Sequence, residues 1–166
     1  MIFESKIINH FESNWIKRDI KSPINQALTV NDITLISEIG LPNDILDFNF
    51  TNEIYSLSLT EIVIGNTYNG GIIILNTQSG NITKDNNCFL ANSLHQLVLQ
   101  LYVYDNLWKN IIPNKDFGNY RENHNHKKYA QFMEQELLKI DPDLLNNDTH
   151  YFWSAFLEDI ESGIVG

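Results

Sequence analysis

The spacing of the apolar residues changes twice along this chain, and this change restricts the possible folds more than any other feature. Near both ends, apolar residues recur every three or four positions, which is typical of amphipathic helices. Between Asp47 and Leu90 they alternate with polar residues or form short runs, which predicts short strands. Strands without intervening helices pair antiparallel more readily than parallel. We therefore expect an α+β fold, with helices packed on a mostly antiparallel sheet of short strands.

Capping and turn residues place the ends of several expected helices. The helical spacing covers residues 2–18, 93–108, 129–140 and 152–160. A further short helix is expected to begin after a cap at Asn31 and to stop at Gly40. Ser93 is followed by Gln96 three residues later, which is the capping-box arrangement at the start of a helix.

The strand region contains one clear hairpin signal. Asn69, Gly70 and Gly71 are typical of a tight turn. The apolar run 72–75 is followed by turn residues 77–80 and then by residues 81–83, which predicts an antiparallel pair. Leu57 and Leu59 are expected to occupy apolar positions of an earlier strand.

A chain of 166 residues, 43% of them hydrophobic, is long enough to bury one core without disulfides or metal ions. We expect one domain over residues 1–166. No apolar run approaches the roughly 20 residues of a membrane helix, and the first residues lack the features of a signal peptide. Cys88 is the only cysteine and cannot form an internal disulfide. These features favour a cytoplasmic protein.

The charge balance restricts the partners. Acidic residues outnumber basic ones by 21 to 11, a net charge of −10 with histidine neutral. Such a surface repels phosphate backbones and anionic lipids, so we expect no nucleic-acid and no membrane partner. A basic protein is the expected partner. The acids between residues 129 and 166 have two interpretations, a solvated helix face or a docking surface for a cationic protein.

Exposed acids in loops and near the C-terminus are the candidate partner-binding residues. They are Asp44, Asp47, Glu53, Glu61, Asp85, Glu158, Asp159 and Glu161.

Motifs that carry chemistry are largely missing from the sequence. It contains neither a phosphate-binding loop nor a dinucleotide-binding glycine motif. His124 and His126 form the only close histidine pair, and two ligands are fewer than a zinc site requires. Neither Cys88 nor Ser93 has the neighbours of an activated nucleophile. We therefore expect no metal, no cofactor and no catalytic residue, although two carboxylates could still meet in space.

Residues 35–104 carry short motifs in a specific order. A Gly-Leu-Pro turn at 40–42 follows the short helix, Ile64-Gly65 closes a strand, a Ser79-Gly80 turn follows the apolar strand, and residues 90–94 open a helix. In this order and spacing the chain resembles the SUKH superfamily of bacterial toxin-immunity proteins, in particular its fourth subgroup. Asn76 stands where the hairpin of that subgroup often has Asp, and Ile82 where Val is common.

The resemblance implies an intracellular, non-catalytic immunity protein that binds the catalytic domain of a cognate toxin and blocks it. Toxins associated with this superfamily are frequently nucleases or nucleic-acid deaminases. It also implies a SUKH-like α+β fold. Two other interpretations stay open, a non-catalytic adaptor or scaffold on the same fold and a small enzyme whose site is assembled only in space.

Overall fold

The computed structural model describes residues 3–51, 53–85, 87–112, 125–145 and 152–164. The chain divides into two compact units, residues 1–101 and residues 102–166. The described residues form an α+β fold with antiparallel sheets, which confirms the expected class. That the whole chain forms a single domain stays a prediction.

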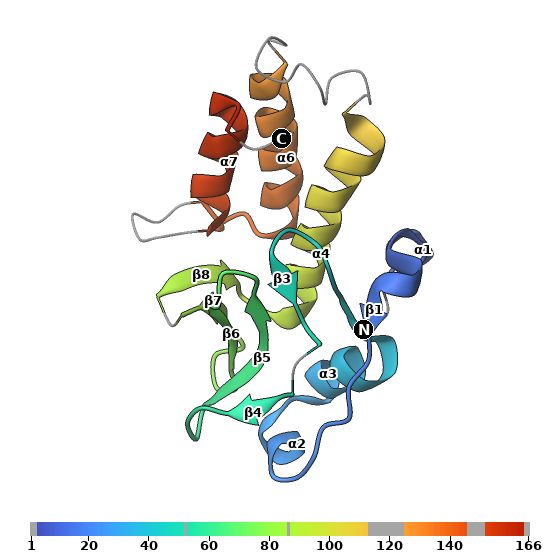
Figure 1. The fold of residues 1–166 in the computed structure, drawn as a ribbon, viewed down its shortest axis with the longest axis vertical. Helices are drawn as coiled ribbons and strands as arrows, with labels where there is room; N and C mark the ends of the chain where they lie inside the picture. Colours follow the sequence, from blue (N-terminus) through green and yellow to red (C-terminus); the bar gives the residue numbers. More distant parts are fainter. Residues whose placement is uncertain (1–2, 52, 86, 113–124, 146–151, 165–166) are drawn as a thin grey trace. The chain divides into compact units, whose positions relative to one another are not determined.

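The first unit is built around a six-stranded antiparallel sheet that curls on itself (Figure 1). The strand order is β3-β5-β6-β7-β8, and β4 also pairs with β5. A bulge shifts the register of β5 against β6 between Val63 and Gly65. The strands are β3 (Phe48–Asn49), β4 (Tyr55–Ser56), β5 (Glu61–Thr67), β6 (Ile72–Asn76), β7 (Ile82–Lys84) and β8 (Cys88–Ala91).

The middle of this sheet forms part of the hydrophobic core. Ile64 of β5 and Ile73 of β6 are fully buried, because both strands carry consecutive apolar residues that are covered on both faces. Ile82 of β7 is fully buried as well. The expected hairpin is confirmed, since Leu75 pairs with Ile82 across β6 and β7. The expected turn before β6 is also confirmed, and the Thr67 N–H donates to the Gly71 carbonyl at 2.7 Å.

The prediction for Leu57 and Leu59 was wrong. β4 ends at Ser56, and the chain reverses at once, because the Leu57 and Ser58 N–H groups both donate to the Glu61 carbonyl. The two leucines therefore lie in a turn, where their exposed fractions are 45% and 97%.

The N-terminal helices differ from the expected ones. Residues 2–18 do not form one helix: α1 (Ser5–Phe11) stops where Glu12 adopts a φ of 35°. A 3-10 turn, η1 (Glu12–Asn14), follows and leads into β1 (Trp15–Ile16), which pairs with β2 (Leu41–Pro42). The next element, α2 (Ile24–Ala27), was not predicted.

The cap of the second helical segment is Thr29 and not Asn31. The Thr29 hydroxyl accepts the Asp32 N–H at 3.2 Å, and the Asp32 carboxylate accepts in return, which is a capping box. The segment continues from α3 (Val30–Ile33) into a π-helical stretch, η2 (Thr34–Ile39). It ends at Gly40, as expected.

The long helix α4 (Leu94–Asn106) begins in the first unit, and residues 102–106 belong to the second. The expected cap at Ser93 is confirmed, since the Gln96 N–H donates to the Ser93 hydroxyl at 3.1 Å. Leu94, Leu97 and Leu101 are fully buried, as their helical spacing predicts.

The second unit is helical in its described residues. After α4 come η3 (Leu107–Ile111), α6 (His126–Ile140) and α7 (Phe152–Ser162). The last two are the helices that the apolar spacing predicts, and they pack against one another. Trp153 and Met133 are fully buried. Each helix of the described residues is too short or too polar to cross a lipid bilayer.

Candidate partner-binding surface

Three of the predicted acids lie at one end of the sheet, next to the turn between β5 and β6. Asp47 directly precedes β3, whose Phe48 pairs with Thr67 at the end of β5. Asp85 directly follows β7, and its N–H donates to the Ile72 carbonyl at the start of β6. We call this surface the acidic sheet end and define it by Asp44, Asp47, Tyr68, Lys84 and Asp85.

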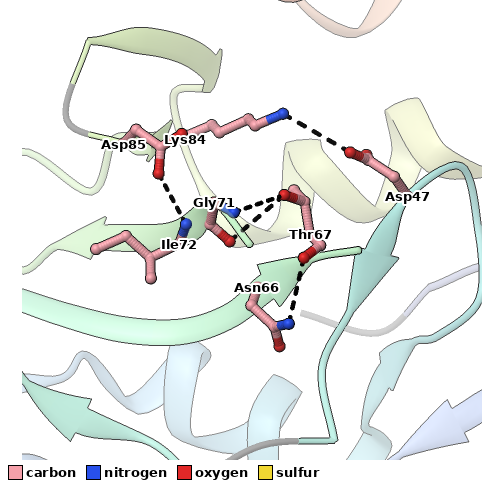
Figure 2. Close-up of polar contacts among 7 residues, drawn as sticks. All are labelled: Asp47, Asn66, Thr67, Gly71, Ile72, Lys84 and Asp85. Atoms are coloured by element: carbon pink, nitrogen blue, oxygen red, sulfur yellow. Dashed lines mark hydrogen bonds and ion pairs between the residues drawn. The ribbon is translucent and has the colours of Figure 1, made fainter. Parts of the chain in front are cut away.

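Asp47 is held by an ion pair. Its carboxylate lies 3.7 Å from the Lys84 ammonium group of β7 (Figure 2). Both side chains are about one-quarter exposed, and such a pair contributes about 1 kcal/mol or less to stability. The pair joins the segment before β3 to β7 and cancels one negative charge of the surface.

Asp85 has a structural role in addition to its charge. It adopts a φ of 52° after β7, and its carboxylate accepts the Ile72 N–H at 2.8 Å (Figure 2). Because the Asp85 N–H also donates to the Ile72 carbonyl, the two residues form a reciprocal pair of hydrogen bonds. This pair fixes the turn after β7 against the start of β6.

Gly71 lies inside the same network. A Cβ atom at this position would lie 2.8 Å from a carboxylate oxygen of Asp85 and 3.0 Å from the Thr67 hydroxyl. The Gly71 N–H donates to that hydroxyl at 3.1 Å (Figure 2). A side chain larger than hydrogen would therefore displace the Asp85 carboxylate or the Thr67 hydroxyl from its present position.

Tyr68 is the residue of this surface that sequence reasoning missed. Its ring is 60% exposed, and its hydroxyl donates a hydrogen bond to the Asp44 carboxylate. This bond raises the pKa of Tyr68 above its usual value, because ionisation would place two negative charges together. The only signal in the sequence was an aromatic residue inside a polar, glycine-rich turn. Exposed tyrosines in such settings are common contact residues in protein interfaces.

Glu53 and Glu61 lie away from the acidic sheet end. Glu61 begins β5 and Thr67 ends it, a separation of about 20 Å along a strand. The Glu61 carboxylate accepts the Ser58 hydroxyl at 3.1 Å. Glu53 is exposed and lines a cavity of about 300 Å³ together with Arg18 and Lys21.

Arg18 anchors the wall of this cavity to the sheet. Its guanidinium group donates to the Ile64 carbonyl at 2.6 Å, at the bulge of β5, and lies 6.0 Å from the centre of the Phe50 ring. Burial lowers the pKa of Arg18 to about 10, so the group is still a cation at neutral pH. The positive charge of Arg18 offsets the negative charge of Glu53, so the cavity is not strongly anionic.

The three C-terminal acids all lie on α7 in the second unit. Glu158 and Glu161 are exposed one turn apart and line an open cavity of about 240 Å³ with Glu134 of α6. Glu161 also pairs with Lys127 at 3.5 Å. Asp159 is half-buried, and its carbonyl accepts the Ile164 N–H at the helix end. Glu158 and Glu161 thus line the same cavity, whereas Asp159 is half-buried and does not line it.

Only one residue of the close histidine pair, His126, lies within the described residues. His124, one half of the close histidine pair, lies outside the described residues. Among the residues that are described, no group of three or more His, Cys, Asp or Glu side chains is arranged to hold a metal ion.

Comparison with known proteins gave no match to any family model, curated protein or solved structure.

Proposed function

We propose that this chain is a cytoplasmic immunity protein that binds a cognate toxin domain and neutralises it by covering its active site. The toxin domain is a basic protein, either a nuclease or a nucleic-acid deaminase, encoded by a neighbouring gene. The order of the motifs between residues 35 and 104, which resembles that of the SUKH superfamily, supports this proposal.

The observation that carries the proposal is the exposed tyrosine among carboxylates at the acidic sheet end. Tyr68 and Asp44 are joined by a hydrogen bond and both are exposed. Asp47 is partly buried on the segment that leads into β3, and its carbonyl accepts the Tyr68 N–H at 3.1 Å. A nuclease site is positive because it must hold phosphates, so an anionic surface associates with it rapidly and competes with its substrate. Inhibition of this kind needs an interface of roughly 1,200–2,000 Å² and no reacting side chain.

Co-expression tests the proposal. The gene directly upstream is expressed in bacteria with and without this chain, and growth and complex formation are measured. We expect the upstream product to stop growth, this chain to restore it, and the two proteins to co-purify at a 1:1 ratio. A toxic upstream product that this chain neither binds nor neutralises would refute the proposal.

A matched pair of variants tests the assigned surface. Asp44→Asn combined with Tyr68→Ser removes the exposed contact pair, and we expect it to weaken the complex about tenfold or more. Asp143→Asn, a charge change of the same size in the second unit, is the control and is expected to leave the affinity unchanged. Binding of several unrelated proteins without loss of their activity would instead favour an adaptor or scaffold.

A further inference from the structure

Three exposed apolar or aromatic side chains of the first unit lie close together in the chain, near the end of β5 that is opposite the acidic sheet end. Six large apolar or aromatic side chains are exposed in the described residues, and three of them lie within residues 55–59. Tyr55 is 48% exposed, Leu57 45% and Leu59 97%. Isolated exposed leucines are ordinary, but a group of this kind marks an interaction surface. We call Tyr55, Leu57 and Leu59 the β4 ridge.

The turn that carries the ridge is held in place by hydrogen bonds. The Leu57 N–H donates to the Glu61 carbonyl at 2.8 Å, and the Ser58 hydroxyl donates to the Glu61 carboxylate at 3.1 Å. On the other side, the Thr77 N–H donates to the Thr60 carbonyl at 2.8 Å. A surface that is already ordered loses little conformational entropy on binding.

The charges around the ridge indicate what it contacts. Residues 53–61 contain two acids, Glu53 and Glu61, and no base. These acids flank the ridge along the chain. Because Arg18 and Lys21 lie in the same cavity as Glu53, the negative charge of this border comes mainly from Glu61, in a molecule with a net charge of −10. An apolar centre with an acidic border matches a partner surface of apolar centre and basic border. A second copy of this chain would bring like charges together, which disfavours self-association through the ridge.

We infer that the β4 ridge is the apolar centre of the interface with the cognate toxin, and that it docks into an apolar depression bordered by Lys or Arg side chains. This inference rests on the proposed function and names the contact that holds the complex together. The acids supply fast association, and the ridge sets the dissociation rate, because desolvated apolar contacts have to be broken before the proteins separate.

Dissociation kinetics test the inference with the purified upstream gene product as the probe. Leu57→Ser combined with Leu59→Ser is expected to raise the dissociation rate about 30-fold and to change the association rate about twofold or less. Val30→Ser, another highly exposed apolar position in the first unit, is the matched control and is expected to bind as the unmodified chain does. Circular dichroism checks that all three proteins are folded.

A second pair of variants separates the border from the centre of the ridge. Glu53→Gln and Glu61→Gln are expected to lower the association rate and its dependence on salt, with little effect on dissociation. Amide hydrogen exchange of residues 55–61 is expected to slow in the complex.

The outcomes distinguish the two proposals. A complex that forms normally with the leucine variants, and leaves exchange of residues 55–61 unchanged, would overturn the inference and leave the proposed function standing. Failure of the unmodified chain to bind the upstream product would overturn both.

Discussion

Gly65 is the residue at which the sheet allows no side chain. It follows the bulge of β5, where the neighbouring chain approaches closely: an added Cβ would lie 2.7 Å from the Asn49 carbonyl oxygen and 2.7 Å from the Phe50 ring. Real Cβ atoms are almost never this close to other heavy atoms. The sequence motif Ile64-Gly65 therefore reflects packing of β3 against β5.

Replacement of Gly65 by alanine is expected to lower the free energy of unfolding by about 2–3 kcal/mol, because the backbone of β3 and the fully buried Phe50 would have to move. Urea denaturation measures this change. Gly70→Asn is the control, since nothing lies within 4 Å of a Cβ there and asparagine tolerates the positive φ of 85°. An equal loss of stability in both variants would contradict the explanation.

The hydrogen bond between Tyr68 and Asp44 changes the pKa of a single side chain. The carboxylate of Asp44 stabilises the neutral phenol, so the pKa of Tyr68 is raised in the folded chain. Asp44→Asn is expected to lower the pKa of Tyr68 toward the ordinary value of 10. Ultraviolet difference titration of the tyrosines measures this pKa, and the Tyr68→Phe variant identifies which signal belongs to Tyr68. Asp47→Asn serves as the comparison, and an identical titration of Asp44→Asn and the unmodified chain would exclude the bond.

Helix α4 carries, next to its capping residue, a histidine whose protonation affects stability. Ser93 caps the helix, and His95 lies in its first turn. The imidazole ring stacks on Phe3 at a centroid distance of 4.7 Å, with the two planes 4° apart. Burial is the main cause that lowers the pKa of His95 below its usual value of 6.5. The packing therefore favours the neutral form of the ring.

A lowered histidine pKa has a defined consequence for stability. Above about pH 6.5 the ring is neutral in the folded and the unfolded chain, and the group adds no pH dependence. As the pH falls below about 6.5, the unfolded chain binds the proton first, so the free energy of unfolding decreases until the pH reaches the folded pKa. His95→Gln is expected to reduce this decrease. Urea denaturation between about pH 7.5 and 5.5 measures it, and parallel curves for both proteins would refute the role of His95.

At the scale of elements, the apolar period located the long helices and the central hairpin. Residues 129–140 and 152–160 carry a stripe that only a helix can bury, and both segments are helical. The segment 2–18 has a similar stripe, yet it becomes helix, turn and strand, because Trp15 and Ile16 pair with β2 from a distant part of the chain. Local periodicity contains no information about such a partner.

The charge of the whole molecule controls how it meets a partner. With a net charge of −10, long-range attraction to a basic protein is expected to raise the association rate. Raising the salt concentration from about 0.05 M to about 0.5 M is expected to lower that rate about tenfold or more, because the screening length falls below about 8 Å. Stopped-flow mixing with the upstream gene product at several salt concentrations measures the rate. A rate independent of salt would contradict electrostatic steering.

For the whole molecule, the sequence by itself determined the fold class, the positions of the long helices and the net charge, because these depend on residue type and short-range spacing. It also named the eight candidate acids, but it did not show that Asp44 and Asp47 lie beside Tyr68 while Glu61 begins the far end of β5. Only the tertiary structure decided this, since the position of a loop depends on which strands pair. The same holds for Leu57 and Leu59: alternation predicts a buried strand face, but a strand that ends after two residues leaves both leucines in water.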